Sequence, residues 1–146
     1  MLIGIDPLLS PELLKILCEM GHGDEVALVD ANFTAESLGR GKPIIRLPGS
    51  DLQRACAAVL TVFPLDAAVA QPVAYMKVSD TPDGYASALQ LSVIALLEAG
   101  GSAGPGQCEA VERFAFYERI KQAYAIVQTG ELRTYANFIF KKGVIN

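Results

Sequence analysis

Apolar residues recur at helical spacing near the beginning of the chain. Ser10-Pro11-Glu12 is typical of a helix start, because serine caps free amides, proline suits the first helical position and an acid meets the positive end of the helix dipole. The spacing predicts a helix that begins at Pro11 and carries the apolar stripe Leu13, Leu14, Ile16, Leu17 and Met20. Gly21 is expected to end this helix in a left-handed conformation.

A second pattern, short apolar runs bounded by polar or turn residues, predicts strands. The run from Glu25 to Asp30 is continuous, as in an internal strand covered on both faces. Further strands are predicted over Ile44–Leu47, Val73–Val78, Tyr124–Val127 and Phe138–Phe140, and further helices over Leu52–Phe63, Tyr85–Ala99 and Arg113–Ala123. Ser50 is expected to cap the first of these helices, and Gly100–Gln107 to be a surface loop. The alternation predicts one layered α/β domain over residues 1–146.

Composition and charge narrow the classes of partner. A net charge of −4, with Lys141-Lys142 as the only cationic pair, argues against nucleic acid. The mean hydropathy of +0.32 is high, yet the apolar windows Ala55–Leu65 and Ala86–Leu97 are shorter than the roughly 20 residues of a membrane span. No cationic region precedes an apolar stretch at the N-terminus, so a cytoplasmic protein is expected. The surplus apolar surface predicts a homo-oligomer, because obligate interfaces resemble a divided core.

The sequence contains none of the common cofactor or metal motifs. Cys18, Cys56 and Cys108 are widely separated, which indicates three buried thiols in a reducing cytosol and no zinc or redox site. There is no phosphate loop, no dinucleotide fingerprint and no Gly-x-Ser-x-Gly elbow. These patterns leave cofactor-free acid–base chemistry, or ligand binding alone.

His22 is the only histidine, and glycines flank it on both sides. Small neighbours leave an imidazole accessible, and its usual pKa of about 6.5 suits proton transfer near neutral pH. Asp24 and Glu25 are the nearest acids in sequence and could orient the ring. From the local pattern alone, a surface histidine in a glycine-rich turn is an equally open interpretation.

Three further segments offer groups that suit a polyhydroxylated ligand. Asp30 ends a predicted buried strand, where α/β sheets gather ligands, although it could also be a turn-forming aspartate. Arg113 offers a guanidinium fork and Tyr117 an aromatic ring with a hydroxyl. Within the same segment, Phe114 and Phe116 are expected in the core, and Glu118 and Arg119 on a solvated helix face. The tripeptide Tyr135-Ala136-Asn137 follows a turn and ends in an amide that both donates and accepts hydrogen bonds.

Several blocks stand in a recognisable order over nearly the whole chain. They are Ile5–Leu14, Met20–Glu25, Asp30–Phe33, Glu112–Arg119, Thr129–Glu131, Tyr135–Asn137 and Lys141–Val144. In these blocks the chain resembles the D-ribose pyranase / L-fucose mutarotase family (RbsD/FucU), and the fucose branch more closely. The resemblance implies a three-layer α/β/α domain with a central, mostly parallel or mixed sheet. It also implies rings of subunits, commonly pentamers stacked into decamers, with sites near subunit contacts.

The resemblance also implies roles for individual residues. His22 corresponds to the acid–base histidine of the family, and Asp30, Arg113 and Tyr135-Ala136-Asn137 to its sugar contacts, with Tyr117 as an addition. We therefore expect an isomerase, without cofactor or metal, that opens and recloses a free monosaccharide, with L-fucose as the first candidate. A sugar-binding protein without catalysis is the main alternative, and a scaffold ring a third. Leu132-Arg133-Thr134 has no counterpart to which a function can be assigned.

Overall fold

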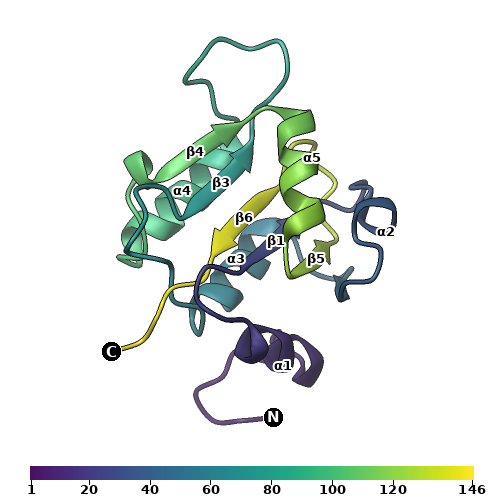
Figure 1. Cartoon of the computed structure of the whole chain (residues 1–146), viewed down its shortest axis with the longest axis vertical. Helices are drawn as coiled ribbons and strands as arrows, with labels where there is room; N and C mark the ends of the chain where they lie inside the picture. Colours follow the sequence, from purple (N-terminus) through teal and green to yellow (C-terminus); the bar gives the residue numbers. More distant parts are fainter.

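The computed structural model describes all 146 residues and is organised around a mixed sheet of six strands in the order β2-β5-β1-β6-β3-β4 (Figure 1). The strands are β1 (Glu25–Val29), β2 (Ile44–Leu47), β3 (Val73–Met76), β4 (Cys108–Val111), β5 (Ala125–Thr129) and β6 (Phe138–Lys141). Neighbouring strands are parallel, except that β6 runs antiparallel to both β1 and β3. The expectation of a mostly parallel or mixed sheet is confirmed as a mixed sheet.

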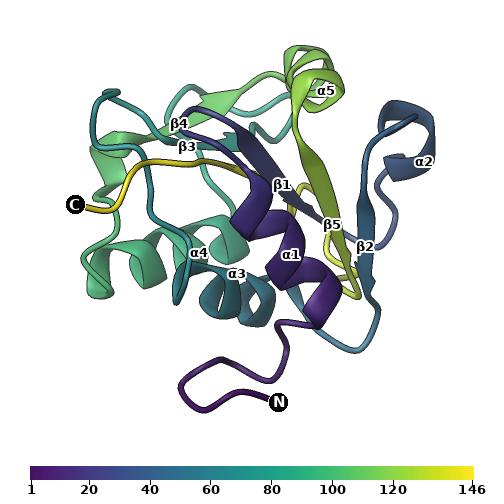
Figure 2. The same ribbon diagram turned by 60° about the horizontal axis from the view of Figure 1, so that its bottom comes forward.

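Helices cover both faces of this sheet, as the expected three-layer architecture requires (Figure 2). One layer contains α1 (Pro11–Glu19), α3 (Leu52–Leu60) and α4 (Ala88–Ala99); the other contains α2 (Ala35–Leu38) and α5 (Arg113–Gln122). Alternate strand residues enter two separate apolar clusters: Val26 and Leu28 join the cluster under α1, α3 and α4, while Ala27 and Val29 join the cluster under α5. Strand β1 is thus buried on both faces, which confirms the interpretation of its continuous apolar run.

The predicted start of α1 is confirmed, whereas two capping expectations are wrong. Ser10 accepts a hydrogen bond from the Leu13 amide at 3.2 Å, and Pro11 is the first helical residue. The helix ends because Met20 becomes extended, and the left-handed residue is Gly23, with φ +88°. At α3, the cap is Asp51, which accepts the Arg54 amide at 2.7 Å, in place of Ser50. An aspartate one residue later is equally able to cap, so the sequence alone did not distinguish the two.

Two short elements were not predicted at all. Strand β4 is an edge strand that pairs only with β3, and helix α2 has four residues. A single turn of helix and the four-residue stretch Cys-Glu-Ala-Val are too short to show a period. The 100–107 loop contains one short 3₁₀ helix, η1 (Pro105–Gln107). No helix is long and apolar enough to cross a membrane.

Candidate active site

A cavity of about 520 Å³ opens at the edge of the sheet where β1 and β3 end and β6 begins. This edge collects residues from distant segments because β6 runs antiparallel to both neighbours, so its first residues meet the carboxyl ends of β1 and β3. The first turns of α5 cover the same edge (Figure 1). The cavity is lined by five of the predicted contact residues: Asp30, Arg113, Tyr117, Tyr135 and Asn137.

Asp30 and Asn137 form the floor of this cavity and are both buried. The Asp30 amide donates to Oδ1 of Asn137 at 3.0 Å, and Oδ1 of Asp30 accepts the Asn32 amide at 3.0 Å. Burial raises the pKa of the Asp30 carboxyl above its usual value, while hydrogen bonds from Asn32, Asn137 and the backbone of Ala136 and Phe33 oppose that rise. The turn-forming and site interpretations of Asp30 therefore both apply, since the carboxylate bonds Asn32 and also lines the cavity.

Helix α5 provides the cationic wall. Nε of Arg113 donates to the Tyr117 hydroxyl at 2.9 Å, and its guanidinium carbon lies 5.5 Å from the centre of the Tyr117 ring. Tyr117 also packs edge-to-face on Phe33. Phe114, which was expected in the core, is 68% exposed beside Arg113 and packs on Tyr117, so this expectation is wrong. Phe116 is fully buried, as expected.

Glu118 and Arg119 on α5 were both expected on a solvated helix face, and the expectation is confirmed only for Glu118. Glu118 is exposed and pairs with Lys121, as a solvated face requires. Arg119 is only partly solvated, with its side chain 23% exposed: it binds Glu25 in a bidentate pair and also contacts Glu109. Glu25 begins β1 under this helix face, so a partly buried acid attracts the guanidinium inward.

Tyr135 enters the cavity from an uncommon backbone conformation, with φ +59°. The fully buried amide of Gln90 on α4 supports it, because Nε2 donates to the carbonyl oxygens of Tyr135 at 2.9 Å and Met76 at 2.7 Å. Ala136 is fully buried, and its side chain joins the apolar cluster on the other face of the sheet. Ala136 therefore does not line the cavity, unlike its two neighbours in the chain.

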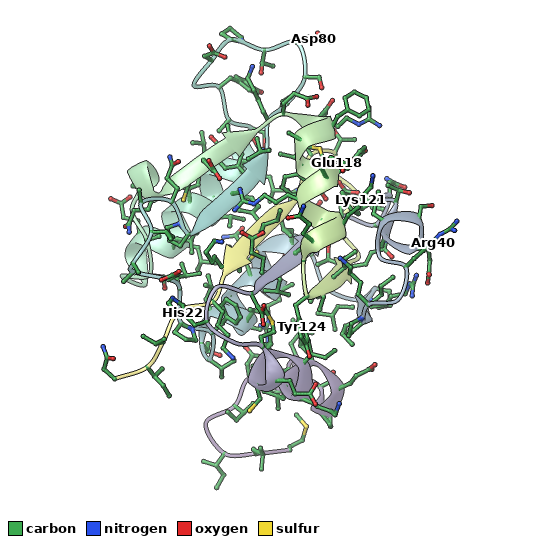
Figure 3. All side chains as sticks on the ribbon, in the orientation of Figure 1. His22, Arg40, Asp80, Glu118, Lys121 and Tyr124 are labelled. Carbon is green, nitrogen blue, oxygen red and sulfur yellow. The ribbon has the colours of Figure 1, made fainter.

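His22 lies elsewhere. It follows α1 and precedes β1, whereas Asp30 follows β1, so the two residues stand at opposite ends of the same five-residue strand. A strand of this length spans about 17 Å. Figure 3 shows His22 on the side of the molecule away from the loop labelled at Asp80, which extends from the cavity edge. His22 lines a different, mainly apolar hollow of about 580 Å³ between α1 and the C-terminal residues.

The partner of the His22 ring is also different from the expected one. Nε2 of His22 lies 3.1 Å from Oδ1 of Asp66, whose side chain is 6% exposed. Asp24 instead accepts the Gly21 amide at 2.7 Å, and Glu25 pairs with Arg119 and Lys141. The expectation that Asp24 or Glu25 orients the ring is therefore wrong. The reason is the tight turn before β1, which directs both acids away from the imidazole.

Sequence reasoning missed half of the cavity lining and the partner of His22. Asn32, Phe33, Thr34, Met76 and Thr134 also line the cavity. Asn32 and Phe33 belong to a block that carried the resemblance, and this was the only signal for them. Within the segment Leu132-Arg133-Thr134, to which no function was assigned, Thr134 lines the cavity and Arg133 pairs with Glu131. No feature of the sequence indicated Asp66 as the partner of His22, because the two residues are far apart in the chain and share no motif. The structure holds no group of three or more His, Cys, Asp or Glu residues that could bind a metal ion.

Several known proteins are similar to this chain over nearly its whole length. An L-fucose mutarotase of Glaesserella parasuis serovar 5 is 45% identical, covering 99% of this chain and 96% of the relative. A fucose mutarotase of Bos taurus is 44% identical, covering 97% and 93%. The crystal structure of the fucose mutarotase of Streptococcus pneumoniae in complex with L-fucose has 37% identity and a TM-score of 0.87, covering 99% of this chain and all of the other. Residues 3–145 match the RbsD / FucU transport protein family, and the chain belongs to this family.

Proposed function

We propose that this protein is a mutarotase that interconverts the ring forms of a free monosaccharide, with L-fucose as its substrate. The observation that carries the proposal is the polar floor and cationic wall of the cavity: a carboxylate, an amide and a guanidinium converge from Asp30, Asn137 and Arg113. Such a set of donors and acceptors suits a ligand that offers a hydroxyl on almost every carbon. The names of the fucose mutarotases to which the chain is similar support the same reaction and the same sugar.

The chemistry requires only proton transfer. Opening the cyclic hemiacetal breaks the bond between the anomeric carbon and the ring oxygen. The ring oxygen gains a proton and the anomeric hydroxyl loses one to solvent, so the sugar keeps its charge. Closure on the other face of the carbonyl reverses both transfers and gives the other anomer. His22 supplies and recovers the ring-oxygen proton, while Asp30, Arg113 and Asn137 hold hydroxyls; a positioned acid–base group contributes about 10²–10⁴-fold.

One copy of the chain does not bring these groups together. A monosaccharide is much shorter than the strand that separates His22 from Asp30. We therefore propose that the site is composite, with the cavity from one subunit and His22 from a second. A homo-oligomer, in the form of a pentameric ring or a decamer, would supply this contact at every site.

Exposed apolar residues at both ends of the chain support such an interface. Val144 and Ile145, which share a hollow with His22, and Leu2 and Ile3 near the N-terminus are between 58% and 106% exposed. The hollow that contains His22 is lined by Leu14, Leu17 and the same C-terminal residues. A subunit contact would remove this apolar surface from water. A cytoplasmic location is supported by the three cysteines, all of which are free thiols. Cys56 and Cys108 are buried as expected, whereas Cys18 is exposed, so the expectation of a buried thiol is wrong there.

The reaction is tested by saturation-transfer NMR, which measures exchange between the α and β anomeric protons of L-fucose. Wild-type protein is expected to accelerate the exchange, and His22→Ala to reduce it by at least about 10²-fold. The exposed pair Lys15–Glu19 on α1 offers a matched control, since Lys15→Ala is expected to exchange like wild type. Saturable fucose binding without any acceleration would refute catalysis and leave a sugar-binding protein.

Complementation tests the composite site. His22→Ala and Arg113→Ala are each expected to be inactive. When the two are co-expressed, some interfaces join a His22→Ala subunit, whose cavity is intact, to an Arg113→Ala subunit, whose histidine is intact. Such an interface contains one complete site. Random assembly makes about a quarter of the interfaces complete. Recovery of that fraction of activity supports two-subunit sites, and no recovery would refute them.

A further inference from the structure

A buried carboxylate, Asp66, is the one acid that contacts the His22 ring. The two side chains differ sharply in environment, since Asp66 is 6% exposed and His22 is 52% exposed. We propose that Asp66 is the positioning residue of His22: it accepts the hydrogen on Nε2 and so makes Nδ1 the atom that exchanges a proton with the sugar. The role in catalysis rests on the function proposed above, whereas the pairing itself can be tested without it.

The backbone brings the two residues together through the end of β6. On one side, the Gly23 amide donates to the Lys142 carbonyl at 2.8 Å, and the Lys142 amide donates to the Asp24 carbonyl at 2.8 Å. On the other side, the Asp66 amide donates to the Lys141 carbonyl at 3.0 Å. The turn that carries His22 and the segment that carries Asp66 are thus both hydrogen-bonded to residues 141–142. Backbone hydrogen bonds, rather than a flexible side-chain encounter, set their separation.

Gly143 allows this close approach. A Cβ atom at this position would lie 2.4 Å from the carbonyl oxygen of Leu65 and 2.9 Å from the Cα of Asp66. The Gly143 amide donates to the Pro64 carbonyl at 2.8 Å, which fixes the segment directly before Asp66. A side chain at residue 143 would displace Asp66 from β6, and with it the partner of His22.

The orientation of the Asp66 carboxylate does not depend on His22. The Ala68 amide donates to Oδ1 at 2.9 Å, and this is the same oxygen that faces the imidazole. Hydrogen bonds from Ala68 and then from His22 lower the pKa of the Asp66 carboxyl below its usual value. The Asp66 carboxylate is therefore charged, and the Ala68 amide fixes its orientation independently of His22. A group that orients a catalytic imidazole requires both properties.

The other charged groups around His22 have hydrogen-bond or ion-pair partners other than its ring. The ammonium of Lys142 donates to the Leu17 and Met20 carbonyls at the end of α1. Lys141 pairs with Glu25 at 3.2 Å and lowers the pKa of Asp66 through its charge. Asp24 accepts the Gly21 amide, and the remaining titratable neighbour is the Cys18 thiol in the same hollow. Asp66 is therefore the only one of these groups whose loss would free Nε2.

The chemistry follows from this assignment. Because Nε2–H donates to Asp66, the other ring nitrogen is left to exchange the proton of the sugar ring oxygen. When Nδ1 is protonated the ring is an imidazolium, and the adjacent carboxylate stabilises that form. When Nδ1 has given its proton away, the ring keeps the Nε2–H tautomer. Asp66 thus stabilises both the imidazolium and the neutral Nε2–H tautomer without a change in the orientation of the ring. No proton passes to Asp66.

The experiment uses two substitutions at Asp66 and one matched control. In Asp66→Asn, the Ala68 amide still directs Oδ1 at His22, so the hydrogen bond persists and only the charge is lost. Asp66→Ala removes both. Asp24→Asn is the control, because it removes an equally local acid that does not contact the ring. For each protein, anomer exchange of L-fucose gives kcat and KM, and ¹⁵N NMR detects the hydrogen on Nε2 of the single histidine, which stays visible only while a hydrogen bond slows its exchange with water.

We expect Asp66→Ala to lower kcat by about 10-fold or more and to leave KM within about twofold, since the sugar contacts lie in another cavity. Asp66→Asn is expected to keep more of kcat than Asp66→Ala and to keep the Nε2–H signal, whereas Asp66→Ala is expected to lose that signal. Asp24→Asn is expected to change neither kcat nor the signal. If Asp66→Ala does not fold, the wild-type Nε2–H signal and the kcat of Asp66→Asn decide.

The absence of an Nε2–H signal in wild-type protein would overturn the pairing, and so would a change in KM without a change in kcat. The NMR measurement needs no activity. If wild-type protein fails to exchange the anomers while the Nε2–H signal is present and is lost in Asp66→Ala, the proposed reaction is refuted and the pairing stands. If exchange occurs but neither the Nε2–H signal nor kcat responds to Asp66→Ala, the pairing is refuted and the reaction stands.

Discussion

Glu131 is a buried carboxylate that connects the loop before β6 to the start of α3. Its side chain is 5% exposed and accepts hydrogen bonds from Nε of Arg133 at 2.8 Å and from its NH2 group at 2.9 Å. The backbone amides of Arg133 and Leu52 complete the set. The hydrogen bond with the Arg133 side chain is the largest cause that lowers the pKa of Glu131, from 4.5 to about 2.

Because folding lowers the pKa of Glu131, the ionised carboxylate stabilises the folded state. Taken at full value, a fall from 4.5 to about 2 is worth about 3.4 kcal/mol, at 1.36 kcal/mol per unit. The Arg133 side chain is 61% exposed, so water screens the pair, and we expect about 1–2 kcal/mol for Glu131→Gln at pH 7. For a chain of this length that loss corresponds to a decrease in Tm of about 3–6 °C.

The sign of the pH dependence follows from the direction of the shift. Because the folded state lowers the pKa, the stabilisation is fully present above pH 4.5, the unfolded value, and is lost as the pH falls towards about 2. Roughly two fifths of it remains at pH 3. The difference between wild type and Glu131→Gln is therefore expected to shrink as the pH falls from 7 to 3.

Urea unfolding followed by circular dichroism at pH 7, 5, 4 and 3, at one protein concentration, measures this difference. Glu36→Gln is the matched control, since Glu36 also pairs with an arginine, at 3.0 Å, but is 76% exposed. Exposed pairs contribute little, so this control is expected to unfold like wild type at every pH. A loss in Glu131→Gln that is the same at pH 7 and pH 3, or no larger than in the control, would refute the reasoning.

Three further predictions concern packing and the site. Gly130→Ala places a Cβ 2.1 Å from a backbone carbonyl oxygen and is expected to cost about 2 kcal/mol, whereas Gly49→Ala, with open space around it, should cost nothing measurable; urea unfolding compares them. Arg119→Met leaves Glu109 without its partner and Glu25 with Lys141 alone, and should lower stability by about 1–2 kcal/mol in the same assay. Gln90→Met frees Tyr135 from its support, so fucose titrations should show weaker binding, and wild-type affinity would contradict this role.

Much of the local structure was determined by short stretches of sequence. The start of α1 at Ser10-Pro11 and the double-sided burial of β1 followed from a cap and a continuous apolar run, both of which act between near neighbours in the chain. Where two neighbours could do the same job, as Ser50 and Asp51 could, local chemistry did not decide. The resemblance carried by ordered blocks identified five residues that line one cavity, although their spacing in sequence gave no geometry.

The arrangement of the site, in contrast, was decided by the tertiary structure alone. The antiparallel insertion of β6 between β1 and β3 brings Tyr135 and Asn137 to the end of β1, and the other end of β6 aligns His22 with Asp66. Helix period and strand alternation arise from interactions within a few residues, so they contain no record of which strands become neighbours. Strand order is set by hydrogen bonds and packing between distant segments. For that reason the sequence could group His22 with Asp30 but could not show that the fold of a single subunit separates them by the length of a strand.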